Sequence, residues 1–457
     1  MIAKSTGIMK ILLIQANSII FPNGKPIATQ MGKYAYAPTT LTTLAAAVPQ
    51  ELEAEIQIID EGVQILPKNF TADLVGISVS TPNAIRAYKI ADDARRRGMT
   101  VVLGGWHISL LPEEALKHAD AIVMGYAEDS WPGLLKDFIS HQLKNVYQDF
   151  SCTSFQSNMT IPRRDLLLRS RYTAPDTIEA TRGCSNQCKY CVNPPLYRDR
   201  HFLRPIENTV HDIDNMQSNK IVFLDSSPTE NLPFIKQLYR AITPLRIKWF
   251  SNITMKVADD DEWLDLAANS GCKGVLIGFE SLNQGILDKN NKRFNRVEKY
   301  CSFIKKLHDQ GIAVLGSFMF GFDGDDVSVF DRTVEFVTQT GIDLAQYATY
   351  IPFPGTLVYT SLEKSGRILH SDWSKYDGKH AVFAPQQMSD DELEEGLYRA
   401  WQNTYSSKSI FKRLTTSRTF VHFTMAANLR FKYFGKSFIH QPQQKRLASP
   451  SRGWEQP

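Results

Sequence analysis

The sequence predicts an α/β protein with two successive parallel sheets and a small helical region at the C-terminus. Short apolar runs alternate with helical patterns through residues 1–140, which is typical of a doubly wound parallel sheet of the flavodoxin-like kind. A second alternating series over residues 174–360 has six strand–helix units, which favours a partial (β/α)6 barrel of the TIM type. Beyond residue 360 the strand patterns stop and helical patterns continue.

The N-terminal series contains five short apolar runs that we expect to be buried strands: residues 10–15, 56–60, 74–79, 100–103 and 121–124. Helical patterns lie between or after them at residues 39–48, 83–97 and 128–139. Doubly wound sheets bind ligands outside the carboxyl ends of their strands. We therefore expect cofactor contacts from residues near these ends: Ser78, Ser80, Thr81, Gly104, Gly105, His107, Gly125 and Glu128.

The second series has six predicted strands: residues 177–181, 221–224, 247–250, 274–278, 313–320 and 344–350. Helical patterns are clearest at residues 259–270 and 297–310, and a glycine that suits a helix end follows each. Residues 141–173, between the two series, are polar and irregular and are expected to form a linker. Catalytic groups of such barrels lie at the carboxyl ends of the strands.

The C-terminal region, residues 361–440, is expected to be helical. Its clearest helix is 389–405, which begins with a Ser-Asp-Asp-Glu capping box. Residues 441–457 are rich in Gln, Pro and Ser and are expected to be disordered. Residues 396–453 contain no Asp or Glu, while Lys and Arg recur. This region either makes a peripheral contact with an anionic membrane or forms an ordinary helix with a solvated basic face.

Composition excludes several classes of protein. The chain has 457 residues, of which 43% are hydrophobic and 22% charged, and its net charge of +4 is too small to indicate nucleic-acid binding. We find no apolar run of about twenty residues and no secretory signal, so we expect a cytoplasmic protein. Six cysteines in so long a chain do not make a disulfide scaffold, but three lie within eight residues, which indicates metal or redox chemistry.

These three cysteines, Cys184, Cys188 and Cys191, follow the first predicted strand of the second series. Thiolates at this spacing can ligate three irons of one cubane and leave the fourth iron without a protein ligand, which is the open position that catalysis needs. The alternative is a zinc site with His201 or His211 as the fourth ligand. The spacing is unlike the paired Cys-x2-Cys of zinc folds, so it favours the cluster.

The Cys-x3-Cys-x2-Cys spacing, with Tyr190 just before the third cysteine, resembles the signature of the radical S-adenosylmethionine (SAM) superfamily. The resemblance implies a 4Fe–4S cluster whose open iron binds SAM, and cleavage of SAM to a 5′-deoxyadenosyl radical. It also implies an external electron donor such as flavodoxin or ferredoxin.

Further segments resemble the same family. Glu280 and Ser281, in Gly278-Phe279-Glu280-Ser281, resemble its Gly-x-Glu-Ser element and would contact SAM, although a helix N-cap is the alternative. Gly316 resembles the glycine of the strand that passes the adenine, although simple packing would also explain it. By position at strand ends alone, we expect SAM or substrate contacts from four more residues: Asp225, Ser226, Ser251 and Asn252.

The N-terminal series resembles the cobalamin-binding domains that precede radical SAM barrels, at the segments around Gly104-Gly105 and at Gly125-Tyr-Ala-Glu128. Cobalamin would lie along these strand ends. The Asp-x-His-x-x-Gly motif that supplies a histidine to cobalt is absent, so His107 is not expected to ligate cobalt. The alternative is that the glycines only turn the chain and that His107 is a local hydrogen-bonder.

Together the resemblances imply cobalamin-dependent methylation of an unactivated carbon of a small-molecule or lipid-like substrate. A radical oxidative cyclase or hydroxylase on the same scaffold is one alternative, and a non-catalytic iron–sulfur or zinc protein is another. A methylthiotransferase is disfavoured, because no cysteine precedes Cys152 to hold the second cluster of that group.

Overall fold

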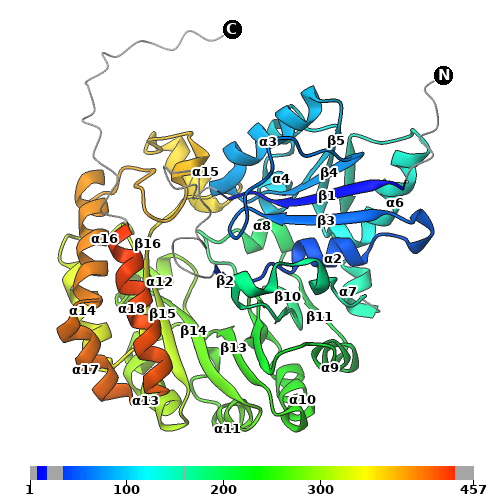
Figure 1. The fold of residues 1–457 in the computed structure, drawn as a ribbon. Helices are drawn as coiled ribbons and strands as arrows, with labels where there is room; N and C mark the ends of the chain where they lie inside the picture. Colours follow the sequence, from blue (N-terminus) through cyan, green and yellow to red (C-terminus); the bar gives the residue numbers. More distant parts are fainter. Residues whose placement is uncertain (1–7, 18–33, 158–159, 438–457) are drawn as a thin grey trace.

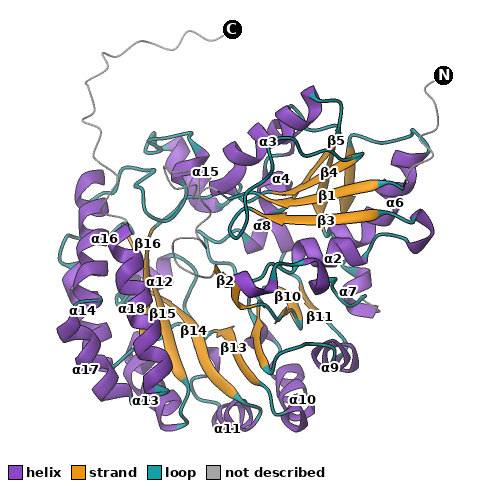
Figure 2. Cartoon of the chain, viewed as in Figure 1, coloured by secondary structure: helices purple, strands orange, loops and turns teal. Residues whose placement is uncertain are grey.

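The computed structural model describes residues 8–17, 34–157 and 160–437. Two parallel sheets form adjacent parts of one molecule, and helices of the C-terminal region flank the second sheet (Figures 1 and 2). The predicted fold class is therefore confirmed. Among the described helices, none has both the length and the apolar content needed to cross a membrane.

The N-terminal sheet has the strand order β3-β1-β4-β5-β6-β7 and is parallel throughout. Its strands are β1 (Lys10–Gln15), β3 (Glu55–Asp60), β4 (Leu74–Ser78), β5 (Thr100–Gly104), β6 (Ala121–Gly125) and β7 (Val146–Asp149). Alternate residues of β1 pack against α3 (Ala84–Arg96) on one face and against α2 (Thr40–Ala46) and α6 (Ala127–Ile139) on the other. The strand order reverses between β1 and β4, which is where sheets of this kind bind ligands.

Residues 141–173, expected to form a linker, instead complete this sheet and join it to the next. β7 pairs with β6, and β8 (Tyr172–Ala174) pairs with β2 (Tyr34–Tyr36). β7 is not visible in the sequence because it is a short edge strand in which Val146 is exposed and Tyr147 is buried, so it has no apolar run.

The second sheet has the order β16-β15-β14-β13-β12-β9, so its strands follow one another as in an open, partial barrel. They are β9 (Thr177–Ile178), β12 (Lys220–Phe223), β13 (Lys248–Ile253), β14 (Cys272–Glu280), β15 (Ala313–Phe320) and β16 (Leu344–Thr349). The connecting helices include α9 (Ile206–Asp214), α10 (Leu232–Ile242), α11 (Asp261–Asn269), α12 (Gln284–Lys289), α13 (Tyr300–Asp309) and α14 (Val329–Thr340). All pairings are parallel, so the strand ends that carry catalysis share one rim.

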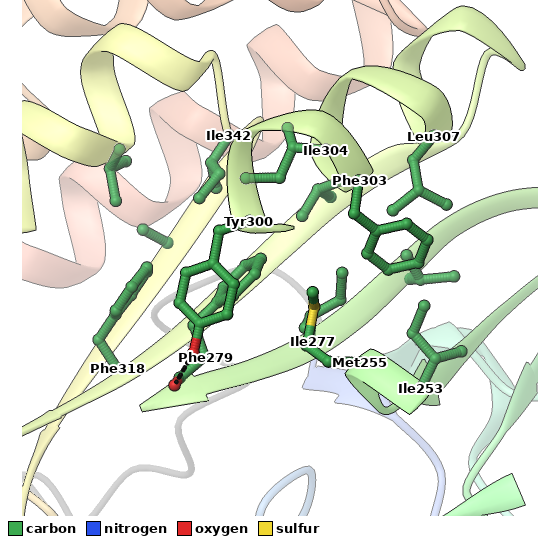
Figure 3. Packing of buried hydrophobic residues seen from close by; sticks show 14 of the residues in the cluster. Ile253, Met255, Ile277, Phe279, Tyr300, Phe303, Ile304, Leu307, Phe318 and Ile342 are labelled. Carbon is green, nitrogen blue, oxygen red and sulfur yellow. Dashed lines mark hydrogen bonds between the residues drawn. The ribbon is translucent and has the colours of Figure 1, made fainter. Parts of the chain in front are cut away.

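An aromatic core lies between this sheet and its helices (Figure 3). Phe279 of β14 and Phe318 of β15 stack with their ring centroids 5.5 Å apart, and Tyr300 of α13 packs on Phe279. The Tyr300 hydroxyl donates a hydrogen bond to the carbonyl oxygen of Phe279 at 3.0 Å. This packing fixes the carboxyl end of β14 against α13.

The C-terminal region contains α15 (Leu357–Lys364), α16 (Asp390–Thr404), α17 (Ser407–Ser417) and α18 (Val421–Ser437). The capping box of α16 forms as predicted: Ser389 Oγ accepts from the backbone N of Glu392 at 3.1 Å, and the backbone N of Ser389 donates to Glu392 Oε2 at 2.8 Å. Arg413 of α17 is fully buried and anchors the helices to the barrel. Residues 441–457, expected to be disordered, lie outside the described residues.

Candidate functional site

The three cysteines lie on a loop between two short antiparallel strands, β10 (Thr181–Gly183) and β11 (His201–Leu203). Gly183, the residue before Cys184, has a φ of +83°, and a Cβ there would overlap the carbonyl oxygen of Arg200. Glycine is required at this position, because it combines that conformation with so close a backbone approach. Since β10 follows β9, the loop lies at the carboxyl end of the first strand of the second sheet.

The cysteines themselves are shielded from water. Cys184 and Cys188 are buried, and Cys191 is half-buried. Asn186 Nδ2 lies 3.2 Å from Cys184 Sγ, and the backbone N of Asn193 lies 3.4 Å from Cys191 Sγ. Burial raises the pKa of Cys188 and raises the pKa of Cys191 to about 12, and the neighbouring cysteines act in the same direction. Three cysteines that influence one another's pKa, two of them with a nitrogen donor near the sulfur, fit an iron–sulfur cluster, whose iron would hold the sulfurs as thiolates.

The zinc alternative lacks a convergent ligand set in the described part of the chain, where no three His, Cys, Asp or Glu side chains are placed to hold one metal ion. A cubane bonds each thiolate to a different iron, so its ligands need not converge on one point, whereas zinc ligands must. His201 lies beside Ser227 and Glu230, and His211 lies on α9.

Glu280 ends β14 in a strained conformation beside the cysteine loop. Its φ is +65°, and the register of β14 against β15 shifts between Gly278 and Glu280. Lys292 Nζ lies 2.5 Å from Glu280 Oε1, and both side chains are largely buried. Asn283 caps α12, so the N-cap alternative for Glu280 and Ser281 is wrong. Strain at an ion-paired carboxylate is typical of a ligand-binding position, and the role of Glu280 toward SAM stays a prediction.

The loop after α12 holds the cysteine loop in place. The backbone N of Lys189 donates to the carbonyl oxygen of Asn290 at 3.2 Å, and the Tyr350 hydroxyl donates to Asn290 Oδ1 at 2.7 Å. Tyr190 is half-buried and packs edge-on against Tyr350, with ring centroids 5.9 Å apart, so it holds the cysteine loop against the barrel. Lys292 belongs to the same segment, and its charge lowers the pKa of the nearby Cys188, against the larger effect of burial. No sequence signal marks Lys292, because it lies in an irregular loop.

Glu230 clamps the stretch between the first two cysteines. Its carboxylate accepts hydrogen bonds from Ser185 Oγ at 2.6 Å and from Asn186 Nδ2 at 2.5 Å, and pairs with Lys256 Nζ at 2.8 Å. Burial raises the pKa of Glu230, but the Lys256 and Ser185 bonds outweigh it, so the pKa stays below its usual range. Glu230 follows β12, so its position at a strand end is the one sequence feature that could have indicated it.

Asp225 braces the chain just before the cysteines. Its buried carboxylate accepts a hydrogen bond from Thr181 Oγ1 at 2.7 Å, and burial raises its pKa to about 7. Asn252 Nδ2 donates to the carbonyl oxygen of Asp225 at 3.0 Å. Ser251 is buried and donates to the carbonyl oxygen of Asn252, while Ser226 is exposed. The four residues are thus brought together at one rim, and their contact with SAM or substrate stays a prediction.

Gly316 faces the aromatic core. A Cβ at this position would approach Phe318 to 3.0 Å, and Ile342 and Phe279 to 3.3 Å. These side chains belong to the cluster of Figure 3, which lies between the sheet and its helices. Packing therefore accounts for this glycine, and passage of its backbone near adenine stays a prediction.

His107 makes hydrogen bonds within the N-terminal part of the protein, which favours the local hydrogen-bonding alternative, and its contact with a cofactor stays a prediction. It is fully buried, Nδ1 lies 3.0 Å from Thr81 Oγ1, and Nε2 lies 3.3 Å from Glu114 Oε1. Trp373 packs edge-on against the imidazole and donates to Glu114 at 3.1 Å. Both ring nitrogens of His107 and the hydroxyl of Thr81 are thus engaged within the protein.

Glu128 is also engaged elsewhere, because it pairs with Arg182 at 2.6 Å, across the boundary between the sheets. Arg182 immediately precedes the glycine of the cysteine loop, so Glu128 links the N-terminal sheet to that loop. Gly105 and Gly125 have φ values of +105° and +83°, and a Cβ at either would overlap backbone of a neighbouring segment. Gly104 makes only ordinary contacts. The turn alternative therefore accounts for Gly105 and Gly125.

A cavity of about 350 Å³ lies at the carboxyl ends of β1 and β4, where the strand order reverses. Of the predicted residues, Ser80 lines it and Ser78 ends the adjoining strand. The lining combines apolar surface with several polar side chains and includes the C-terminal region: Gln15, Ala16, Asn17, Tyr36, Pro38, Asp60, Ser80, Pro82, Asn83, Asp377 and Lys379. Donors and acceptors of this kind fit part of a large, amide-rich cofactor such as cobalamin.

Comparison with known proteins gives two family matches. The radical SAM superfamily matches residues 178–337, and the B12 binding domain matches residues 34–135. The chain is 31% identical over 372 residues to bacteriochlorophyllide d C-12(1)-methyltransferase of Chlorobaculum tepidum, which covers 79% of this chain and 81% of that protein. It is also 31% identical over 360 residues to the bacteriochlorophyllide d C-8(2)-methyltransferase of the same organism, with 75% and 79% covered.

Two solved structures share the fold. TsrM from Kitasatospora setae, a radical SAM methyltransferase solved with cobalamin and a 4Fe–4S cluster bound, has a TM-score of 0.65 at 14% identity over 94% of this chain and 99% of that one. OxsB, solved with aqua-cobalamin and SAM, has a TM-score of 0.64 at 14% identity, over 94% and 74%. In both likenesses the whole succession of two sheets and C-terminal region is matched, not one sheet alone.

Proposed function

This chain belongs to the cobalamin-dependent radical SAM methyltransferase family, and on that premise we propose that it methylates an unactivated carbon of a small-molecule or lipid-like substrate. One observation carries the proposal: the cysteine loop is docked against the carboxyl-end side of the B12-type sheet. Arg182 and Glu128 form an ion pair across that boundary, and Trp106 of the first sheet packs edge-on against Phe353 of the second at 5.2 Å. The cysteine loop therefore lies beside the carboxyl ends of the first sheet, which supports two cofactors that act on one substrate.

The cofactors of this family are a 4Fe–4S cluster, SAM and cobalamin, which together supply a radical that takes a hydrogen atom and a methyl group that replaces it. The protein supplies binding and orientation. Cys184, Cys188 and Cys191 would hold the cluster, and Glu280 with Lys292 offers a carboxylate and an ammonium to the amino and carboxylate groups of SAM. Burial of Cys184 and Cys188 would limit the access of water to the cluster.

The substrate class that the relatives favour is a tetrapyrrole. The two relatives at 31% identity are named for methylation of bacteriochlorophyllide d, and we propose a macrocycle of that kind as the substrate to test first. An oxidative cyclisation is the second candidate, because a relative at 23% identity is the anaerobic magnesium-protoporphyrin IX monomethyl ester cyclase of Cereibacter sphaeroides.

Further parts of the proposal concern partners and place. We propose that flavodoxin or ferredoxin delivers electrons to the cluster, that the enzyme works in the reducing cytoplasm, and that its basic C-terminal region contacts a membrane peripherally. The absence of acidic residues over 396–453 supports the last of these.

The test is anaerobic reconstitution followed by reaction with methyl-labelled SAM, a reductant and bacteriochlorophyllide d. We expect iron, sulfide and cobalt in the protein, and formation of 5′-deoxyadenosine, S-adenosylhomocysteine and a labelled methylated product. Cys188→Ala should lose cluster iron and 5′-deoxyadenosine, whereas the control Cys301→Ala, at an exposed cysteine of α13, should keep both.

The outcomes separate the alternatives. 5′-Deoxyadenosine with an oxidised, unlabelled product would favour the cyclase or hydroxylase. Absence of 5′-deoxyadenosine from protein that holds a full cluster would favour a non-catalytic iron–sulfur protein and would overturn the proposal.

A further inference from the structure

The solvent side of the C-terminal helices is unusually apolar. On α17, Phe411 is 71% exposed, and on α18 the exposed fractions are 60% for Phe423 and 56% for both Leu429 and Tyr433. Met425 is exposed beside them. We call these five residues the α17–α18 surface. Large apolar side chains that are exposed on two helices packed against each other indicate a candidate binding site.

α18 is inverted relative to an ordinary surface helix, because several of its inward residues are polar. Thr424 and Asn428 are fully buried. Asn428 Nδ2 donates to the carbonyl oxygen of Asp343 at 2.9 Å, and Asn428 Oδ1 accepts from Arg413 at 2.7 Å. A surface helix normally directs its apolar residues to the core and its polar residues to water. Phe431 of α18 does pack against Trp401 and Tyr405, but packing in the core does not account for the exposed apolar residues of the same helix.

The charged residues of α17 and α18 themselves have one sign. Residues 396–453 contain no Asp or Glu. The helices and the turn between them carry a set of cations: Lys408, Lys412, Arg418, Arg430 and Lys432. Apolar side chains next to lysine and arginine, without carboxylates, are typical of helices that lie in the interface of an anionic bilayer.

Two kinds of protein partner suit the α17–α18 surface less well than a bilayer does. A symmetric dimer through this surface would place each patch against its own copy and so oppose like charges. An acidic electron donor must reach the cluster at the carboxyl ends of the strands, but α18 starts at their amino ends. There, Thr419 bonds to Asp343, the residue before β16, and Lys273 of β14 lies 6.0 Å from the Phe420 ring centroid.

The position of α18 also suits delivery of a lipid-like molecule. β9 and β16 are the two edge strands of the partial barrel. α18 packs beside β16, and Arg430 of α18 donates to Thr173 Oγ1, in the strand before β9, at 2.9 Å. α18, which carries four of the five residues of the α17–α18 surface, therefore lies beside the opening between β16 and β9.

We propose that the α17–α18 surface binds the plane of an anionic lipid bilayer, with its apolar side chains at the acyl boundary and the cations at the headgroups. This proposal specifies the membrane contact named in the proposed function. It rests on the proposed function only for the reason why an enzyme of this kind would bind a membrane. Binding is measured without turnover, so its failure would leave the proposed reaction standing.

The test is co-sedimentation of the full chain with vesicles of phosphatidylcholine alone and of equimolar phosphatidylcholine and phosphatidylglycerol. We expect binding to the mixed vesicles, weakened by high salt, and little binding to phosphatidylcholine. The variant Phe423→Ser with Leu429→Ser should bind the mixed vesicles at least about tenfold more weakly, because it removes apolar area from the interface.

The matched control is Ile65→Ser with Val327→Ser, which removes exposed apolar side chains outside the surface and should bind like the wild type. Circular dichroism and light scattering accompany each variant. Wild-type protein that stays in the supernatant would overturn the proposal, as would a Phe423/Leu429 variant that sediments like the wild type. A wild-type dimer that this variant converts to monomer would assign the surface to a second copy instead.

Discussion

Gly183→Ala tests whether the cysteine loop depends on its glycine hinge. The substitution forces alanine to a φ of +83°, which costs about 1–2 kcal/mol. Its Cβ also overlaps the carbonyl oxygen of Arg200, a backbone atom that can retreat only if the β10–β11 ladder opens. Overlap in a packed region costs about 1–3 kcal/mol more. We therefore expect a loss of about 2–5 kcal/mol in unfolding free energy, together with loss of cluster iron.

Gly98→Ala is the matched control for that experiment. Gly98 has nearly the same φ, +82°, but a Cβ there meets no atom within 4 Å. It should therefore lose only the conformational part, about 1–2 kcal/mol, and should keep its iron. Urea denaturation and iron analysis of the reconstituted proteins measure both effects. Equal stability of the two variants, with full iron in both, would refute the hinge role of Gly183.

Two further predictions concern buried charged groups. Arg413→Ala should lower the unfolding free energy by at least about 3 kcal/mol in urea denaturation, because carbonyl oxygens before β16 and at the end of α16 lose their donor. The control is Lys412→Ala at the exposed neighbouring residue, which should change the unfolding free energy by no more than about 0.5 kcal/mol. Equal losses in the two variants would contradict the anchoring role of Arg413. Burial raises the pKa of Asp325 to about 6, so the folded state holds this proton more tightly than the unfolded chain. The stability contribution of Asp325 should therefore fall by about 3 kcal/mol as pH rises from about 4 to about 6, and Asp325→Asn, compared with the wild type by denaturation across that range, should remove this decline.

The fold was largely predictable because burial leaves a local trace. The run at residues 10–15 is apolar because both faces of β1 are covered, and the capping box at Ser389 starts α16 where its own side chains satisfy the first backbone donors. β7 leaves no such trace, because an edge strand with one buried side chain looks like polar loop.

The site was predictable only where one short segment carries it. The three cysteines can be recognised from their spacing, but the residues that hold their loop in place come from distant parts of the chain. Glu230 and Lys292 reach the loop from after β12 and after α12. Glu128 looked like a cofactor contact because it follows a strand end, yet its partner is Arg182, more than fifty residues away in the sequence. Pairings of this kind depend on the folded arrangement, which local patterns do not contain.

The indole of Trp373 has a consequence for how the protein is made. It donates to Glu114, 259 positions earlier, and packs against the imidazole of His107. The first sheet emerges from the ribosome long before this residue does. Until Trp373 has been synthesised, His107 and Glu114 lack this packing partner. The whole second sheet must therefore be synthesised before the N-terminal sheet has all of its contacts. A fragment that ends after the first sheet should therefore be less stable than the same sheet in the complete protein.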